Sequence, residues 1–218
     1  MTRRRGPVAL TFDDGPWAEG TGPILHLLAL HGAPATFFIW GRQASSHPDL
    51  VRRIVDAGHS VQPHCFSHTS HHEMTPEQIR ADLDRVLDLL TELGVPRPHL
   101  WRPPYGQWRK DATDVIARER GLGLTGWTID TRDFDGRPAT QMNDEVLAEL
   151  DAAADGGPEA VVLMHDCPLE PGQWAMRHDV AETVELLRLL LEGSGRRFVA
   201  HTTAVTNGLD SAWTEVRR

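Results

Sequence analysis

The sequence VALTFDDGP at residues 8–16 sets the pattern from which the fold is inferred. A short, mostly apolar run ends in two carboxylates and a Gly-Pro pair, which is typical of a buried strand followed by a turn. The sequence AVVLMHD at residues 160–166 has the same design and ends in a histidine and an aspartate. Both stretches predict buried strands with polar side chains at their carboxyl ends.

Similar apolar runs alternate with amphipathic segments along the chain. Strands are predicted at residues 7–12, 35–40, 60–62, 100–101, 122–129, 160–164 and 198–200. Helical periodicity falls at residues 24–30, 48–57, 76–93, 111–120, 143–154 and 180–191. Buried strands alternating with helices indicate a parallel sheet. The sequence lacks a glycine-rich phosphate loop, which argues against a dinucleotide-binding fold. We therefore expect an α/β protein, a single-domain (β/α) barrel with about seven parallel strands.

Length and composition limit the alternatives. The chain has 218 residues and a formal charge of −9, from 31 acidic and 22 basic residues. One domain is expected at residues 7–205, with tails at 1–6 and 206–218. The negative charge argues against nucleic acid or an anionic membrane as a partner. No apolar run reaches the length of a membrane span or of a signal segment, so a cytoplasmic protein is expected. The sequence gives no sign of an obligate protein partner.

Polar residues of matching chemistry follow the predicted strands. They are Asp13 and Asp14, the stretch from His64 to His68, Arg102, Asp130 with Asp133, and His165 with Asp166. In a (β/α) barrel the carboxyl ends of all strands meet at one face, where active sites are built. These side chains are therefore expected to line one pocket.

The histidines predict a metal site. His64 and His68 are four residues apart, so on a helical turn or a tight turn of similar pitch both imidazoles can reach one ion. His68 and His72 have the same spacing, and spacing alone does not choose between the two pairs. One carboxylate from Asp13 or Asp14 would complete a hydrolytic His/His/Asp zinc site, and the other would serve as general base. A solvated turn is the alternative for these two carboxylates.

A general acid is needed opposite the base. His165 is the candidate, and a neighbouring carboxylate from Asp133 or Asp166 would keep it protonated. Arg102 can hold a carboxylate with its forked guanidinium. The alternative for His165 is a structural histidine, and the alternative for Arg102 is a surface ion pair. The two cysteines, Cys65 and Cys167, are expected to be small buried thiols.

The ordered polar motifs resemble those of the polysaccharide deacetylases, which form carbohydrate esterase family four and include chitooligosaccharide and peptidoglycan N-deacetylases. The matching stretches are TFDDGP at residues 11–16, HCFSH at 64–68 with ATFF at 35–38, RPPYG at 102–106, DTRDF at 130–134 and LMHD at 163–166. They occur in the family's order and cover roughly residues 7–203.

The resemblance implies a distorted (β/α) barrel that binds one divalent metal ion, zinc in most members. By motif position it implies that Asp14, His64 and His68 are the ligands and that Asp13 is the base. It also implies supporting roles for Arg102, which orients Asp13; for the backbone N–H of Tyr105, which binds the oxyanion; for Asp133, which tunes His165; and for Leu163, which contacts the acetyl methyl.

The expected activity is removal of acetyl from an N-acetylated amino sugar, either an oligosaccharide or a small metabolite. Two alternatives use the same fold: an O-acetyl esterase, and a carbohydrate-binding or regulatory module without turnover. Trp17 and Trp174 are candidates for stacking on sugar rings, with core packing as the alternative. Two positions depart from the family pattern: Pro63 replaces the usual Asn, and Phe134 replaces the usual Trp.

Overall fold

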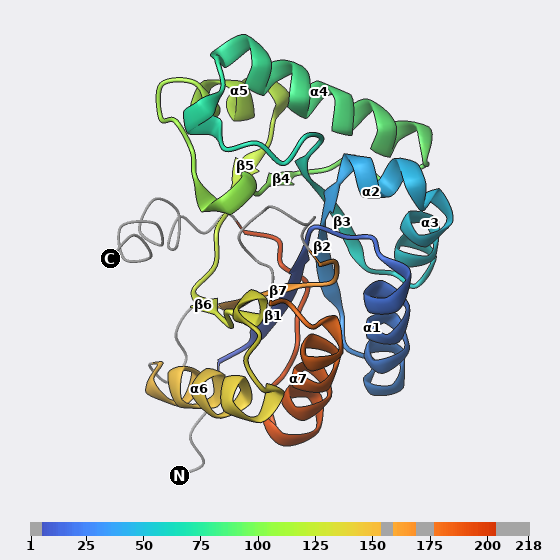
Figure 1. The fold of residues 1–218 in the computed structure, drawn as a ribbon, viewed down its shortest axis with the longest axis vertical. Helices are drawn as coiled ribbons and strands as arrows, with labels where there is room; N and C mark the ends of the chain where they lie inside the picture. Colours follow the sequence, from blue (N-terminus) through green and yellow to red (C-terminus); the bar gives the residue numbers. More distant parts are fainter. Residues whose placement is uncertain (1–5, 154–158, 169–176, 204–218) are drawn as a thin grey trace.

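The computed structural model describes residues 6–153, 159–168 and 177–203. Trp174 and most of the two predicted tails lie outside these residues. Seven strands are present in the described part: β1 (Val8–Asp13), β2 (Ala35–Trp40), β3 (Ser60–Cys65), β4 (Leu100–Trp101), β5 (Gly123–Leu124), β6 (Ile129–Asp130) and β7 (Ala160–His165). Figure 1 shows them at the centre of the molecule.

The strands follow one another around an interrupted barrel. Five form a parallel sheet in the order β3-β2-β1-β7-β6, and β4 pairs with β5, also in parallel. The backbone N–H of Arg102 donates to the Pro63 carbonyl over 3.4 Å, which places β4 beside β3. The circular order is therefore the chain order. The predicted α/β barrel with seven parallel strands is confirmed, although the strands divide into sheets of five and two.

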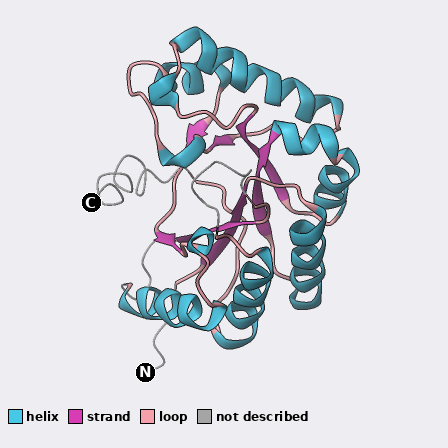
Figure 2. Ribbon diagram, viewed as in Figure 1, coloured by secondary structure: helices cyan, strands magenta, loops and turns pink. Residues whose placement is uncertain are grey.

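Seven helices surround the strands in the described residues (Figures 1 and 2). They are α1 (Ala18–His31), α2 (Gly41–Ser46), α3 (Pro48–Asp56), α4 (Pro76–Glu92), α5 (Thr113–Arg120), α6 (Ala139–Ala152) and α7 (Val180–Gly193). Helix α4 begins with the capping box that its sequence predicts, in which Thr75 and Gln78 bond each other's backbone N–H groups. Three short 3₁₀ turns are η1 (His71–Glu73), η2 (Pro104–Gly106) and η3 (Asp133–Asp135).

Alternation along β1 and β7 separates the helix-facing core from the barrel interior. Leu10 and Phe12 belong to the large core cluster between strands and helices. Leu163 packs in a smaller cluster with Ala9, Val161 and Trp127. Because alternate residues share a face, Thr11 and Asp13 follow Ala9 into the interior, and His165 follows Leu163. Both strands are buried on both faces, which explains their nearly continuous apolar sequence.

Strand β3 differs from its prediction because it continues through Pro63 to Cys65. Ile39 and Trp40 of β2 pair with Pro63 and Cys65, so His64 is an extra residue opposite that step, as in a β-bulge. Pro63 has no N–H to donate, which weakens the ladder at this point. The histidine stretch therefore begins inside a strand and continues into a bend, so the helical turn, one of the two predicted alternatives, is not formed between His64 and His68.

Side chains close the gap between β3 and β4. The amide oxygen of Gln62 accepts from the backbone N–H groups of His99 and Leu100, at 2.9 and 2.8 Å. The indole of Trp101 donates to the His64 carbonyl over 2.9 Å. This seam thus joins the two sheets through groups that a strand pattern does not reveal.

Two other strand predictions need correction. Residues 122–129 form two short strands, β5 and β6, which pair in different sheets, β5 with β4 and β6 with β7. Residues 198–200 form only a single parallel bridge, between Phe198 and Val8. The prediction also missed α2, whose short polar sequence has little periodicity.

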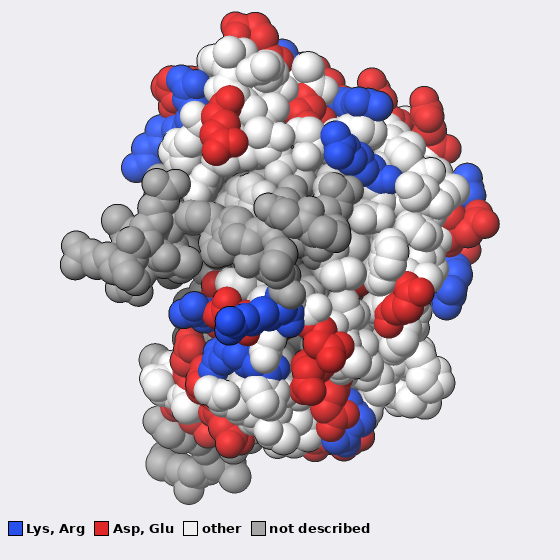
Figure 3. All heavy atoms as spheres, in the orientation of Figure 1, with Lys and Arg blue, Asp and Glu red and all other residues white. Residues whose placement is uncertain are grey.

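No helix among the described residues is both long and apolar enough to cross a membrane. On the face drawn in Figure 3, basic and acidic side chains are interspersed over the described surface.

Candidate active site

Asp14 lies between the two histidines of the predicted pair. Its Oδ1 is 3.3 Å from Nε2 of His64 and 3.0 Å from Nε2 of His68, and all three side chains are buried. Asp14 Oδ1 nevertheless has no hydrogen-bond partner among the described residues. Three electron-pair donors thus converge without protons suitably placed between them, as expected where a cation belongs.

The backbone adopts unusual conformations to bring these ligands together. Asp14 has a φ of 76° and His68 a φ of 55°, both in the left-handed region. Asp and His adopt this region more readily than most residues. Together with the bulge at His64, these conformations aim three side chains at one point. Strained backbone of this kind is typically retained at functional sites.

The structure brings His64 and His68 to Asp14, and it places His72 elsewhere. His72 is exposed on η1, whereas His64 and His68 face Asp14. His71 is buried on the other side, where it contacts Thr113 over 3.1 Å. Burial lowers the pKa of His71 to about 3, so it remains neutral. The pair with the metal-site geometry is therefore His64 and His68.

A second donor set overlaps the first. His64, Cys65 and His68 also offer donor atoms within 4.8 Å of one another. Burial raises the pKa of the Cys65 thiol well above its ordinary value, and the nearby Asp82 carboxylate adds to this. For Asp14, burial alone would raise the pKa, but the charges and hydrogen bonds of His68 and His64 in their protonated forms hold it well below its usual range. Asp14 is thus ionised where Cys65 is not, and it is the better third ligand. Both cysteines are free and buried, as expected.

Tyr105 fixes the orientation of His68. Its hydroxyl donates to the His68 carbonyl over 3.2 Å, so its single proton is used. The contact of 3.1 Å between Tyr105 Oη and His68 Nδ1 then requires the imidazole to donate. A proton on Nδ1 leaves the electron pair of Nε2 directed at Asp14, as in a metal ligand. The sequence predicted a role only for the Tyr105 backbone.

Asp13 is held by Arg102. Nη1 of Arg102 donates to Asp13 Oδ1 over 2.7 Å and to the Thr11 hydroxyl over 2.9 Å, while Nη2 donates to the Gly126 carbonyl over 2.7 Å. The guanidinium also lies 4.0 Å from the centre of the Phe38 ring and is fully buried. The other oxygen of Asp13 is 4.0 Å from His64 Nδ1. Arg102 therefore orients Asp13 and is no surface ion pair.

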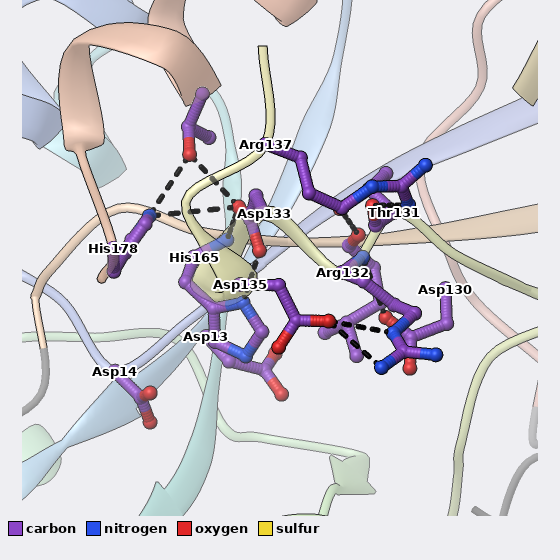
Figure 4. Close-up of polar contacts among 12 residues, drawn as sticks. Asp13, Asp14, Asp130, Thr131, Arg132, Asp133, Asp135, Arg137, His165 and His178 are labelled. Carbon is purple, nitrogen blue, oxygen red and sulfur yellow. Dashed lines mark hydrogen bonds and ion pairs between the residues drawn. The ribbon is translucent and has the colours of Figure 1, made fainter. Parts of the chain in front are cut away.

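His165 is the strand partner of Asp13. The two residues are in register between β7 and β1, so their side chains leave the sheet side by side. Nδ1 of His165 donates to Asp133 Oδ1 over 2.7 Å (Figure 4). Burial alone would lower its pKa, but the charge and hydrogen bond of Asp133, with smaller effects of Asp14 and Asp13, raise the pKa of His165 to about 10. The ring is therefore an imidazolium at neutral pH.

A second histidine, which sequence reasoning missed, reaches the same carboxylate. Nε2 of His178 is 3.8 Å from Asp133 Oδ2 (Figure 4) and 2.9 Å from the hydroxyl of Thr183. Thr183 also donates to Asp133 Oδ2 over 2.9 Å. His178 precedes the N-cap of α7, at no spacing that marks a site, so the sequence carries no signal for it.

Asp166 has a supporting role instead of contacting His165. The Thr21 hydroxyl donates to its Oδ2 over 2.5 Å, and the carboxyl packs directly against Gly15, where an added Cβ would lie 2.2 Å from the same oxygen. Burial raises the pKa of Asp166 to about 7. Of the two predicted partners for His165, Asp133 is the one in contact. Asp166 supports the turn that carries Asp14.

The remaining predicted site residues lie as follows. Leu163 is buried in the barrel interior two residues before His165. The half-buried Trp17 packs edge-on against His47, with ring centres 5.5 Å apart. Phe134 packs edge-on against His165, with ring centres 5.6 Å apart. Trp174 lies outside the described residues.

Comparisons with known proteins agree on one family. A polysaccharide deacetylase family model matches residues 1–126, more than half of the chain. The chitooligosaccharide deacetylase of Rhizobium leguminosarum bv. trifolii is 37% identical over 168 residues, which cover 74% of this chain and 72% of that protein. The peptidoglycan-N-acetylglucosamine deacetylase of Bacillus cereus is 33% identical over 164 residues, 75% of this chain and only 57% of its own length.

A solved structure gives the same result. The family 4 carbohydrate esterase from Streptomyces lividans, in complex with acetate, has a TM-score of 0.72 and 29% identity, with 85% of this chain and 86% of that chain covered. The family model, the similar proteins, the barrel fold and the five ordered motifs all indicate the same family. The chain therefore belongs to the polysaccharide deacetylase family.

Proposed function

We propose that this protein is a zinc-dependent N-deacetylase that releases acetate from an N-acetylated amino sugar. The observation that carries the proposal is the convergence of Asp14, His64 and His68 beside two anchored groups, Asp13 and His165. The two similar deacetylases act on chitooligosaccharide and on peptidoglycan N-acetylglucosamine. We extend the shared substrate feature, an N-acetylated glucosamine unit, to this chain.

The three ligands suit a hydrolytic zinc ion. Two imidazoles and one carboxylate leave a coordination position open, unlike the four protein ligands of a structural site. When bound, zinc supplies Lewis acidity, which lowers the pKa of water to about 7 and polarises the acetyl carbonyl.

Asp13 and His165 divide the proton transfers. Asp13 accepts the proton of the attacking water, with its carboxylate kept in position by Arg102. His165 donates its Nε2 proton to the nitrogen of the leaving amine, since Nδ1 is bonded to Asp133. An amine leaves poorly unless it is protonated, so the raised pKa of His165 matches its role.

Two further groups complete the proposed pocket. The backbone N–H of Tyr105 stabilises the developing oxyanion, and its left-handed φ of 60° places it on the η2 turn beside His68. Leu163 contacts the acetyl methyl from the floor of the barrel. A larger acyl group would meet this apolar floor, so acetyl is the expected acyl group.

Acetate release across a panel of compounds tests the proposal. The panel contains chitooligosaccharides, peptidoglycan fragments, N-acetylglucosamine and O-acetylated sugars, each with added zinc and with a chelator. We expect acetate from at least one N-acetyl sugar, lost with chelator and restored by zinc. A zinc-loaded, folded protein that releases acetate from no member would contradict the proposal and favour a binding module.

A matched pair of variants tests the ligand assignment. H64A removes a ligand and H72A removes the exposed histidine with the same spacing from His68. H64A is expected to weaken zinc binding and to abolish acetate release, whereas H72A should change neither. An equal loss of zinc in both would refute the assignment.

A comparison of ester and amide substrates tests the role of His165 as general acid. An alcohol leaves more readily than an amine, so H165N should damage amide hydrolysis more than ester hydrolysis on matched N-acetyl and O-acetyl sugars. Equal losses on the two would contradict the role of His165 as acid. Acetate release from the O-acetyl sugars alone, with none from any N-acetyl sugar, would favour the O-acetyl esterase.

A further inference from the structure

His178 is a buried histidine to which the proposed reaction assigns no step. Its side chain is 1% exposed, and it lies in the space between α7, η3 and the end of β7. The ring stands 6.1 Å from that of His165 at an angle of 77° (Figure 4). Asp133 thus lies between two imidazoles, one on each oxygen.

The hydrogen bonds fix the direction of donation. Thr183 donates its only hydroxyl proton to Asp133 Oδ2, so its oxygen must accept from its other neighbour. That neighbour is His178 Nε2 at 2.9 Å, which must therefore carry a proton. A chain of donors runs from His178 through Thr183 to Asp133, and the other oxygen of Asp133 receives the Nδ1 proton of His165.

These hydrogen bonds leave the Asp133 carboxylate with little freedom to rotate. Oδ2 accepts from Thr183 and from the backbone N–H of His165, at 2.9 and 2.8 Å. Oδ1 is then directed at His165 Nδ1. Without a donor at the His178 position, the Thr183 oxygen would lack a partner in a buried site and the hydroxyl would reorient. Asp133 would lose one of its two fixed contacts at Oδ2.

We propose that His178 is a positioning residue that, through Thr183, holds the Asp133 carboxylate in line with His165. The inference rests on the proposed function, because it assigns His178 to the general acid of that reaction. His178 acts as a donor and transfers no proton to the substrate. Its side chain therefore matters for the protonation of His165 and not for zinc binding.

The groups around His178 act on its pKa in opposite directions. The groups that face it are Asp133 from η3, His165 from β7, the Cys167 backbone and, at longer range, Asp14. Burial lowers the pKa of His178, and the positive charge of His165 acts in the same direction, whereas Asp133, Asp14 and a hydrogen bond with the Cys167 backbone raise it. The pKa of His178 is lowered on balance, and the 2.9 Å contact with the Thr183 hydroxyl places a proton on Nε2.

Titration of His165 by NMR provides the test. In zinc-loaded protein with isotope-labelled histidine, the His165 signal is assigned by its absence in H165N. We expect H178F to lower the pKa of His165 by roughly half a unit to one unit, the scale of one lost hydrogen bond. T183V should give a similar shift, and H178F/T183V no more than the larger single shift, because both act on one path.

Two more variants separate this role from simple packing. H178Q keeps an N–H donor near the Nε2 position and is expected to restore the titration of His165. H201F replaces another buried histidine that contacts a threonine, Thr125, away from Asp133, and should leave that titration unchanged. Thermal unfolding confirms that each variant is folded.

The outcomes are decisive whether or not acetate is released. An unchanged His165 titration in H178F, a rise in its pKa, or equal shifts in H178Q and H178F would overturn the inference. If the protein releases acetate, the basic limb of kcat/KM should move to lower pH by the same amount. If no substrate is turned over, the proposed function fails while the NMR titration still decides the role of His178.

Discussion

Replacement of Arg102 by methionine is the strongest test of how the barrel and the base depend on one residue. Arg102 is fully buried and bonds Asp13, Thr11 and the Gly126 carbonyl. Methionine keeps an apolar side chain over Phe38, but it leaves the buried Asp13 carboxylate and the Gly126 carbonyl without their hydrogen-bond donor. Removal of one partner of a buried ion pair costs about 3–5 kcal/mol, a large part of a domain's total stability.

Urea unfolding followed by tryptophan fluorescence measures this loss. We expect the free energy of unfolding of R102M to fall by about 3–5 kcal/mol with little change in the slope against urea. R120M is the matched control, since Arg120 also donates twice to a carboxylate, that of Asp84, but is partly exposed. Such an exposed pair is worth about 0–1 kcal/mol.

A second substitution isolates the stranded charge. In D13N/R102M the carboxylate that lacks a partner is replaced by a neutral amide, so the double variant should be more stable than R102M. A loss of less than ~1 kcal/mol in R102M, no larger than that of R120M, would refute the buried bridge. A double variant that is less stable than R102M would refute the electrostatic explanation.

Three further predictions follow from the structure. Asp133 raises the pKa of His165 to about 10 against the effect of burial. The protonated histidine therefore stabilises the fold fully below its unfolded pKa near 6.5, and progressively less as pH rises towards 10. Urea midpoints at pH 6 and pH 9.5 should differ less in H165N than in the unaltered protein. G15A places a Cβ 2.2 Å from an Asp166 oxygen and should weaken zinc binding measured by calorimetry. T75A removes the α4 capping box and should lower the unfolding free energy by about 0.5–2 kcal/mol, measured in urea.

Each of these has an outcome that would contradict it. An equal pH dependence in H165N and the unaltered protein would show that His165 is not coupled to Asp133. For G15A the control is G22A, where an added Cβ meets nothing within 4 Å; equal zinc affinity in both variants would rule out the packing of the turn. An unchanged midpoint in T75A would mean that the cap contributes nothing to stability.

The sequence predicts the parts of the fold that depend on local pattern. The apolar runs of β1, β2 and β7 locate the centre of the sheet, and the capping residues of α4 locate its start. Strand β3 was predicted too short because Pro63 interrupts the pattern while tertiary pairing with β2 extends the strand through it. The short β5 and β6 were merged because two-residue strands have no measurable period.

The site was predictable where motif order supplied what spacing could not. Spacing left His64 and His72 equivalent, and only the family resemblance favoured His64 before the geometry was known. His178 and Thr183 were not predictable, since they reach Asp133 from the segment before α7 and from α7 itself, 45 and 50 residues further along the chain. The side-chain role of Tyr105 likewise depends on a turn that brings it back to His68.

The seam between β3 and β4 has a consequence for local unfolding. The two sheets meet there through Gln62, Trp101 and the Arg102 backbone, without a continuous ladder. Segments joined by few backbone bonds open at a lower free energy than the whole domain. Separation of β4 from β3 would carry Arg102 away from Asp13 while β1, β2 and β7 stay paired. Catalytic failure on warming would then precede global melting, and amide exchange at Leu100 would report it.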